Sequence, residues 1–428
     1  MERQSLLAQP FSSAEVLHFF LVITILVVAA KVGALLFKKL HLPEMMGEIL
    51  AGVLFGSAVL GALAPSFYVF LFVNSDRAVS ALLPLQDLGL MLLMFCSTVD
   101  LQVAVPCKKE YKLALLLTFT GLLFPLLFTL VCFDFLPFPF LHSLLLGSLQ
   151  DVFALKLIFA MAIAIPSLPM ILRILSDLHL LKSSFARIVL NSAIFQDLLI
   201  YGALSVLLAS VASKAVNHLL LIKHTVMTAL FLGVAIYLSS FAPEALKRLI
   251  RKIFSKMGPL AVMMLTFSSF IVAAILCDVA PFLGALVAGM AILSIASEKN
   301  LPRFQEEFSK LKSIAYLIFI PLYFMGIGMR LDLLHKSHLR LILLFFLLSS
   351  VVRVASLYLG TLKSTLPVRE RLNIAVALNT RGVPGIILAT LAFSAGIISE
   401  EFCLALIMAS LFTATLTGMW LAKKGAEN

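Results

Sequence analysis

An aspartate lies deep inside a long apolar stretch of this sequence, where charged side chains are rare. Asp197 lies about thirteen residues into the stretch 184–210, which is roughly 20 Å along a helix. A carboxylate at that depth of a membrane costs about 3 kcal/mol or more, so it is by default functional or paired. An aspartate that can take up a proton is also a ligand for hard cations. The position therefore indicates proton or cation transport.

An arginine in a second apolar stretch is a candidate partner for this carboxylate. Arg353 lies in 338–361, about eight residues, or roughly 12 Å, from the end that shares a membrane face with the start of 184–210. The difference in depth is within the reach of an arginine side chain. We expect an ion pair between Asp197 and Arg353 when no ion is bound. The alternative is a buried structural pair with no transport role.

Two further apolar stretches carry helix-breaking residues near their middles. Pro166 and Pro169 flank Ser167 in the stretch 153–176. Each proline removes a backbone donor and excludes a preceding carbonyl, so a break is expected, and non-helical backbone at this depth survives only beside protein or a wet cavity. A simple proline kink is the alternative reading of either stretch taken alone. The stretch 371–395 has its own cluster at similar depth, which consists of Asn379, Thr380, Arg381, Gly382, Pro384 and Gly385.

The composition requires a membrane to hold these elements. Of the 428 residues 61% are hydrophobic and only 13% are charged, and the mean hydropathy is +1.08, which excludes an ordinary soluble protein. The net charge of +11 therefore indicates orientation in a membrane rather than binding to nucleic acid. We expect an all-α integral membrane protein with about thirteen transmembrane helices, at 15–37, 44–63, 81–101, 112–134, 153–176, 184–210, 219–241, 258–277, 281–297, 312–331, 338–361, 371–395 and 400–422.

The basic residues predict which way the chain crosses the membrane. Twenty-two of them fall in the odd-numbered connections and the C-terminal tail, against seven on the opposite side. This bias places the N-terminus outside and the C-terminus in the cytoplasm. The first apolar stretch begins near Glu15 and is too long for a cleavable signal, so it is expected to be a retained helix.

A short motif occurs twice, in stretches that cross the membrane in opposite directions. The sequence LPEMMGEILAGV covers 42–53, and APFLGALVAGM covers 280–290, seven spans later. This predicts two inverted repeats, 14–210 and 257–422, joined by a linking helix at 219–241, which is an architecture typical of secondary transporters. The alternative is that the glycines only allow helices to pack closely.

The order of these motifs resembles the monovalent cation:proton antiporter-2 family over almost the whole chain. The stretches IPSLPMILRILSDLHLL and NTRG are similar to plant-type cation/H+ exchangers, and the Gln196-Asp197 pair is similar to potassium-efflux antiporters. The resemblance implies the sodium/proton antiporter fold with two crossed, broken helices. It also implies a homodimer, with a core part at 110–210 and 338–422 and a dimerisation part at 14–105 and 257–335. We expect a transporter without the cytoplasmic regulatory domain of those relatives.

The resemblance also implies roles for individual residues. Asp197 is the expected ion-binding acid and the transient ligand of Na+ or K+, and Arg353 and Arg381 are its basic partners. The other expected cation- and proton-binding residues are Gln196, Ser167 and Asn379, and the expected helix breaks are Pro166, Pro169, Gly382, Pro384 and Gly385. Departures from the family pattern are Ser167 in place of Thr, Thr98 in place of Gly, and Gly385 in place of an acid.

These observations predict a secondary active transporter that exchanges Na+ or K+ for H+ by alternating access, without a cofactor. The exchange is expected to be electroneutral, because Gln196 precedes a single acid at Asp197. The expected location is a bacterial inner membrane. Three alternatives stay open: a sodium-coupled organic-anion symporter of the bile-acid type, a polytopic membrane enzyme, and a scaffold or sensor without transport activity. The enzyme reading lacks a HExxH motif or any Ser/His arrangement.

Overall fold

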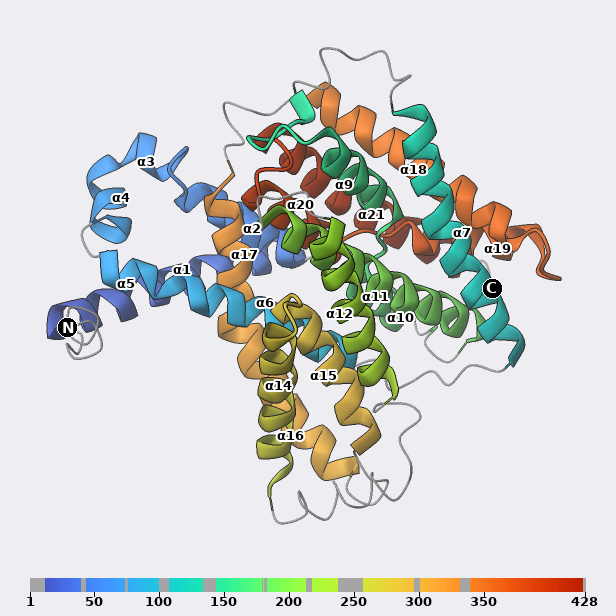
Figure 1. Cartoon of the computed structure of the whole chain (residues 1–428). Coiled ribbons are helices and arrows are strands. Elements are labelled where there is room, and N and C mark those ends of the chain that lie inside the picture. The colour runs from blue at the N-terminus through green and yellow to red at the C-terminus, as the bar shows by residue number, and fades with distance from the viewer. Residues whose placement is uncertain are drawn as a thin grey trace. The chain divides into compact units, whose positions relative to one another are not determined.

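The structure of the chain is a computed structural model (Figure 1). Apart from one isolated antiparallel bridge between Leu146 and Ile398, the regular elements in the described part are all helices. They belong to two compact units, one formed by the described residues of 1–93 and 305–335 and the other by those of 94–304 and 336–428. The structure describes residues 12–39, 44–73, 76–99, 108–133, 144–178, 180, 183–212, 218–237, 257–295, 301–331 and 339–425.

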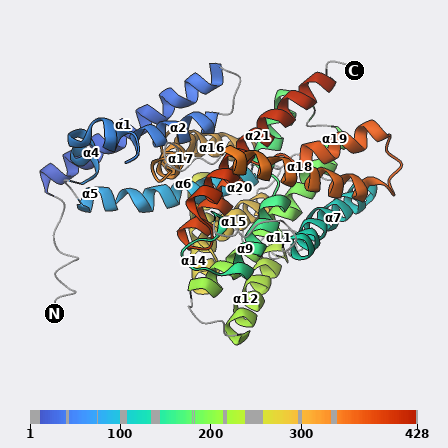
Figure 2. The ribbon, with the colours of Figure 1, turned by 90° about the horizontal axis from the view of Figure 1, so that it is seen from above.

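The first unit consists of the N-terminal part of the chain and one later, continuous helical run. Its helices are α1 (Ser13–Lys39), α2 (Glu44–Phe55), α3 (Leu60–Leu63), α4 (Pro65–Phe72), α5 (Asp76–Ser80), most of α6 (Leu82–Val99), most of α16 (Leu301–Ile314), the π-helix η3 (Ala315–Phe319) and α17 (Ile320–Met329). In both views α1 and α2 lie side by side (Figures 1 and 2). Helix α3 lies inside the expected stretch 44–63, whereas the short helices α4 and α5 were not expected from the sequence.

Small residues bring the helices of this unit together. The backbones of α1 and α2 touch at Gly33 and Gly47, because a Cβ on either would overlap the other's carbonyl. The same holds for Gly52 of α2 against the carbonyl of Met325 in α17. The glycines of the repeated motif therefore pack helices in this unit.

The second unit contains the remaining helices, including both of the interrupted ones. They are α7 (Lys108–Cys132), α9 (Val152–Ala164), α10 (Leu168–Asp177), α11 (Ser184–Ala212), α12 (His218–Ile236), α14 (Pro259–Leu276), α15 (Pro281–Ile295), α18 (Leu339–Thr361), α19 (Val368–Leu378), α20 (Val383–Ser394) and α21 (Glu400–Gly425). Helix α7 lies against both α11 and α18 (Figures 1 and 2). A buried apolar cluster that includes Leu117, Leu175, Ala193, Leu357 and Leu378 holds this region together.

Helix lengths agree with a polytopic membrane fold. In the described part, ten helices or helix pairs are long and apolar enough to cross a bilayer, and α9, α12 and α15 are shorter apolar helices. The expected all-α fold with about thirteen helices and two broken helices is thereby confirmed. Residues 238–241 of the expected linking helix lie outside the described residues.

Candidate functional site

The first helix break separates α9 from α10 and spans three residues. Helix α9 ends at Ala164, Ile165 has extended backbone angles, and α10 begins at Leu168. Pro166 lies in the gap and Pro169 is the second residue of α10, a place where the missing proline N–H leaves no hydrogen bond unmade. The break exposes the last carbonyls of α9 and the first N–H groups of α10 in the interior of the unit.

The second break separates α19 from α20. Helix α19 ends at Leu378, and α20 begins at Val383 with Pro384 as its second residue. Between them, the backbone N–H of Arg381 donates to Oγ1 of Thr413 at 3.1 Å. A side chain of α21 therefore replaces the helical acceptor that the break removed.

The two breaks contact each other. A Cβ on Gly382 would lie 2.7 Å from Oγ of Ser167 and 2.6 Å from Cγ of Met170. Glycine is thus the residue that permits this approach, because any side chain would push the breaks apart. Gly385 likewise packs against Ser410 of α21, whose Oγ a Cβ would overlap.

Asp197 of α11 faces the first break. Its side chain is almost fully buried, and its carboxylate interacts with the backbone N–H of Leu168 at the start of α10. Among the described residues, its Oδ1 has no hydrogen-bond partner. One carboxylate oxygen is therefore buried but still able to accept a ligand.

Arg353 of α18 pairs with the neighbour of this aspartate. It is fully buried and donates to the side-chain Oε1 of Gln196, to the carbonyl of Gly121 in α7, and to the carbonyl of Leu378 at 3.4 Å. Nε2 of Gln196 donates in turn to the carbonyl of Leu117 at 3.0 Å. The expected direct ion pair between Asp197 and Arg353 is absent from the described residues, because consecutive side chains on a helix point about 100° apart and Gln196 is the one that faces α18.

Several other oxygens at the two breaks are buried without a partner in the described part of the chain. Besides Oδ1 of Asp197, they are Oγ of Ser167, Oδ1 of Asn379 and Oγ1 of Thr380. Carboxylate, hydroxyl and amide oxygens are the donors that hard cations such as Na+ and K+ accept. In the same part of the chain, no group of three or more His, Cys, Asp or Glu side chains is placed to hold a resident metal.

Arg381 lies at the second break with only part of its guanidinium engaged. It is 1% exposed, its Nη1 donates to Oγ of Ser349 at 2.6 Å, and its guanidinium carbon lies 5.9 Å from the ring centre of Phe345. Its Nε and Nη2 have no hydrogen-bond partner among the residues described. The two expected basic partners therefore differ, since all three nitrogens of Arg353 are bonded.

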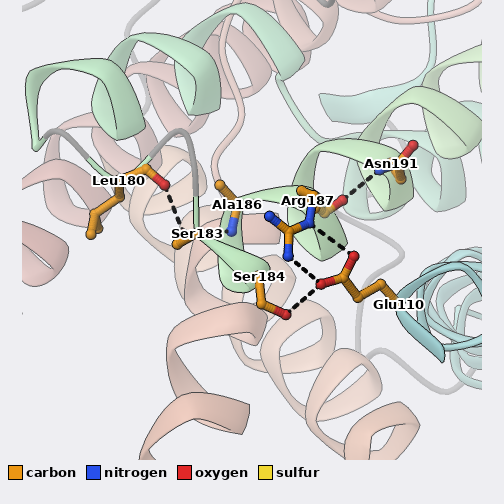
Figure 3. Close-up of polar contacts among 7 residues, drawn as sticks. All are labelled: Glu110, Leu180, Ser183, Ser184, Ala186, Arg187 and Asn191. Carbon is orange, nitrogen blue, oxygen red and sulfur yellow. Dashed lines mark hydrogen bonds and ion pairs between the residues drawn. The ribbon is translucent and has the colours of Figure 1, made fainter. Parts of the chain in front are cut away.

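Polar contacts that were not expected from the sequence fix α11 against α7. Arg187 donates through Nε and Nη2 to the two oxygens of Glu110 at 2.9 and 2.7 Å, and Oγ of Ser184 donates to Oε1 at 2.7 Å (Figure 3). Further along the same interface, Oγ of Ser192 donates to the carbonyl of Ala114 at 3.3 Å. Together with the hydrogen bond of Gln196, these contacts fix the position of α11, and with it Asp197, along the axis of α7.

Other charged residues, and Thr98, which departs from the family pattern, are not part of the group of residues at the two helix breaks. In the first unit, Nζ of Lys31 lies 3.5 Å from Oε1 of Glu48 and donates to the carbonyl of Tyr316 at 2.7 Å. Thr98 packs against Gly289 of α15.

Comparison with known proteins places the chain in a family. The family model described as sodium/hydrogen exchanger, transmembrane, matches residues 22–423. The K(+)/H(+) antiporter 1 of Saccharomyces cerevisiae is 28% identical over 89% of this chain, which spans only 44% of the yeast protein. The Na(+)/H(+) antiporter of Enterococcus hirae is 21% identical over 94% of this chain and 96% of its own length.

The fold agrees with a solved structure. The sodium proton antiporter MjNhaP1 from Methanocaldococcus jannaschii superposes with a TM-score of 0.68 and 16% identity, and the match covers 96% of this chain and 99% of that one. A family match over nearly the whole chain decides between a transporter and an enzyme. The chain belongs to the sodium/hydrogen exchanger family, and it is a membrane antiporter of monovalent cations and protons rather than an enzyme.

Proposed function

We propose that this chain exchanges Na+ or K+ for H+ at the carboxylate of Asp197. The observation that carries the proposal is the free, buried Oδ1 of this residue at the point where the two helix breaks meet. Ser167, Asn379 and Thr380 supply the neighbouring oxygens that would surround a dehydrated cation. The names of the yeast and Enterococcus relatives support K+ and Na+ as the candidate substrates.

Competition for one carboxylate couples the two ions. Protonated Asp197 is neutral, and Asp197 with a bound monovalent cation is again neutral, whereas the bare carboxylate is costly to move through a low-dielectric interior. Only the two neutral forms cross between the faces of the membrane. Because Gln196 cannot titrate, one proton exchanges for one cation without net charge movement.

The ends of α10 and α19 at the two breaks stabilise the charges of Asp197 and Arg353 when no ion is bound. Asp197 lies at the N-terminus of α10, where the helix dipole is positive, and Arg353 donates to Leu378 at the C-terminus of α19, where it is negative. A cation that binds Asp197 therefore does not first have to break a direct pair with Arg353. We assign Gln196 the role of holding this arginine apart from the transported ion.

The wider organisation belongs to the proposal as well. The N-terminus lies outside and the C-terminus in the cytoplasm, in a bacterial inner membrane, and the protein is a homodimer. Residues 110–210 and 338–422 form the moving core, and 14–105 and 257–335 form the dimerisation part. The bridge between Leu146 and Ile398 joins two connections that are expected on the same side of the membrane. This contact supports the proposed order in which the spans cross the membrane.

Reconstituted protein tests the function directly. Liposomes that contain the purified chain and an internal pH dye are given an imposed pH gradient and then challenged with Na+, K+, Li+ or choline. We expect Na+ or K+ to dissipate the gradient and choline to leave it intact. Absence of any cation-dependent proton flux in folded protein would contradict the proposal, and uptake of an organic anion with Na+ would favour a symporter.

The orientation has its own test. In a cysteine-free background, Ser148→Cys reports on an expected external connection and Lys363→Cys on an expected cytoplasmic one, and both positions are exposed. An impermeant thiol reagent added to intact cells should label position 148 and spare 363. The reverse pattern would overturn the orientation.

A further inference from the structure

Two arginines in the second unit use the same edge of the guanidinium in different ways. In Arg187, Nε and Nη2 form two parallel hydrogen bonds to the oxygens of Glu110 (Figure 3). This edge is the planar fork that matches a carboxylate. In Arg381 the same two nitrogens have no partner among the described residues, although the side chain is 1% exposed. One fork is filled by the protein itself, and the other has no protein acceptor.

A buried guanidinium edge without hydrogen-bond acceptors is energetically unfavourable. Each buried N–H group without an acceptor loses its hydration, and a buried cation without a counter-charge loses more. Ser349 accepts only from Nη1, and Phe345 offers only its ring face. Neither contact supplies a negative charge.

The buried charged groups beside the two helix breaks indicate that a partner of Arg381 would be an anion. Within the described part of the second unit, the buried charged groups beside the breaks are Arg353, Arg381 and Asp197. Arg353 has acceptors for all three of its nitrogens. When Asp197 is ionised, one positive charge is therefore left over, and it resides on the arginine that lacks acceptors.

We propose that Arg381 binds a small monovalent anion, of the formate or bicarbonate class, on its Nε–Nη2 edge. Two oxygens of a planar anion match the two N–H groups in the way that Glu110 matches Arg187. The bound anion neutralises the excess charge, and it stays beside the second break while cations and protons exchange at Asp197. This anion is an auxiliary ligand and is not transported.

A thermal-shift titration tests the proposal on the purified full chain. Formate and gluconate are compared as N-methylglucamine salts at equal ionic strength, since gluconate is too bulky for a buried fork. We expect formate to raise Tm saturably, by roughly 1.5 °C at tenfold excess over Kd, and gluconate to have no such effect. No shift, or an equal shift with gluconate, would overturn the proposal.

Two arginine variants locate the effect. Arg381→Lys keeps the charge but removes the planar fork, so the formate shift should disappear. Arg187→Lys makes the same change at a fork that Glu110 already fills, so the shift should remain even if the baseline Tm falls. A formate shift that survives in Arg381→Lys contradicts the assignment.

A structural measurement covers the case in which Arg381→Lys does not fold. A difference map between crystals of the wild-type protein grown with formate and with gluconate locates the anion. A peak between Nε and Nη2 of Arg381 supports the proposal, and its absence there overturns it. Neither measurement depends on transport activity, so failure of this proposal and failure of cation/proton exchange are separate results.

Discussion

The guanidinium of Arg353 donates a hydrogen bond to Oε1 of Gln196, and the adjacent carboxylate of Asp197 keeps one buried oxygen free of any partner in the described part of the chain. The basic residue thus lies beside the acid without occupying it. Gln196 also donates to Leu117 of α7, so its amide is held at both ends. This arrangement leaves Asp197 available to a proton or a cation.

Removing the amide should allow the arginine to reach the acid. In Gln196→Ala, Arg353 loses an acceptor, and we expect it to turn toward Asp197 and to compete with the cation. Hydrogen bonds to charged groups contribute about 1.5–3 kcal/mol, so KM for the cation should rise by roughly tenfold or more. Liposome flux at varied cation concentration measures KM, and Asn191→Ala on the same helix is the control. An unchanged KM would show that Gln196 does not hold Arg353 away.

The contact between the two breaks predicts a strong effect of one methyl group. Gly382→Ala places a Cβ within 3 Å of Ser167 and Met170, which should separate the breaks, cost about 1–3 kcal/mol of stability and lower kcat. Gly233→Ala in α12 is the matched control, since nothing lies within 4 Å of its Cβ position. Thermal unfolding in detergent and flux in liposomes measure both effects. Equal behaviour of the two variants would contradict the close crossing.

The pair of Glu110 and Arg187 should stabilise the α7–α11 interface. Glu110→Gln leaves the half-buried guanidinium of Arg187 with a single, neutral acceptor on its Nε–Nη2 edge, and we expect a loss of about 1–3 kcal/mol in unfolding free energy. Glu306→Gln makes the same change in an exposed pair with Lys310 and should change stability by less than about 0.5 kcal/mol. Denaturation midpoints of the two variants give the comparison. A larger loss in Glu306→Gln would refute this ranking.

Charge balance follows from the single acid at the crossing. Exchange of one proton for one cation moves no net charge, so wild-type protein on a solid-supported membrane should give no sustained cation-driven current. Flux in liposomes should likewise be insensitive to an imposed membrane potential. A sustained current that disappears in Asp197→Asn would require a second proton carrier, and Glu48, buried beside Lys31, would be the first acid to neutralise.

Much of the fold followed from local sequence features. Apolar stretches of bilayer length predicted the spans, and Pro166, Pro169 and Pro384 predicted the positions of the breaks, because proline acts on the backbone of its own helix. The short helices between Leu63 and Ala81 were missed, since they are too short to show a periodic pattern.

The partners within the site could not be predicted in the same way. Whether Gln196 or Asp197 faces Arg353 depends on the rotation of α11 about its axis, and one residue of difference turns a side chain by about 100°. The pair of Glu110 and Arg187 joins residues 77 positions apart, so no local sequence pattern predicts it. The unfilled fork of Arg381 becomes visible only when every acceptor around it has been placed.

The flux carried by Asp197→Asn tests the central claim most directly. The amide keeps the shape of the carboxylate but cannot exchange a proton, so Na+- or K+-driven proton flux in liposomes should vanish while the protein stays folded by thermal unfolding. Asp278→Asn makes the same substitution at an exposed aspartate paired with Lys223 at 2.8 Å, and its flux should equal that of the wild type. Wild-type flux in Asp197→Asn would contradict the account, because the exchanged proton would then have to reside elsewhere.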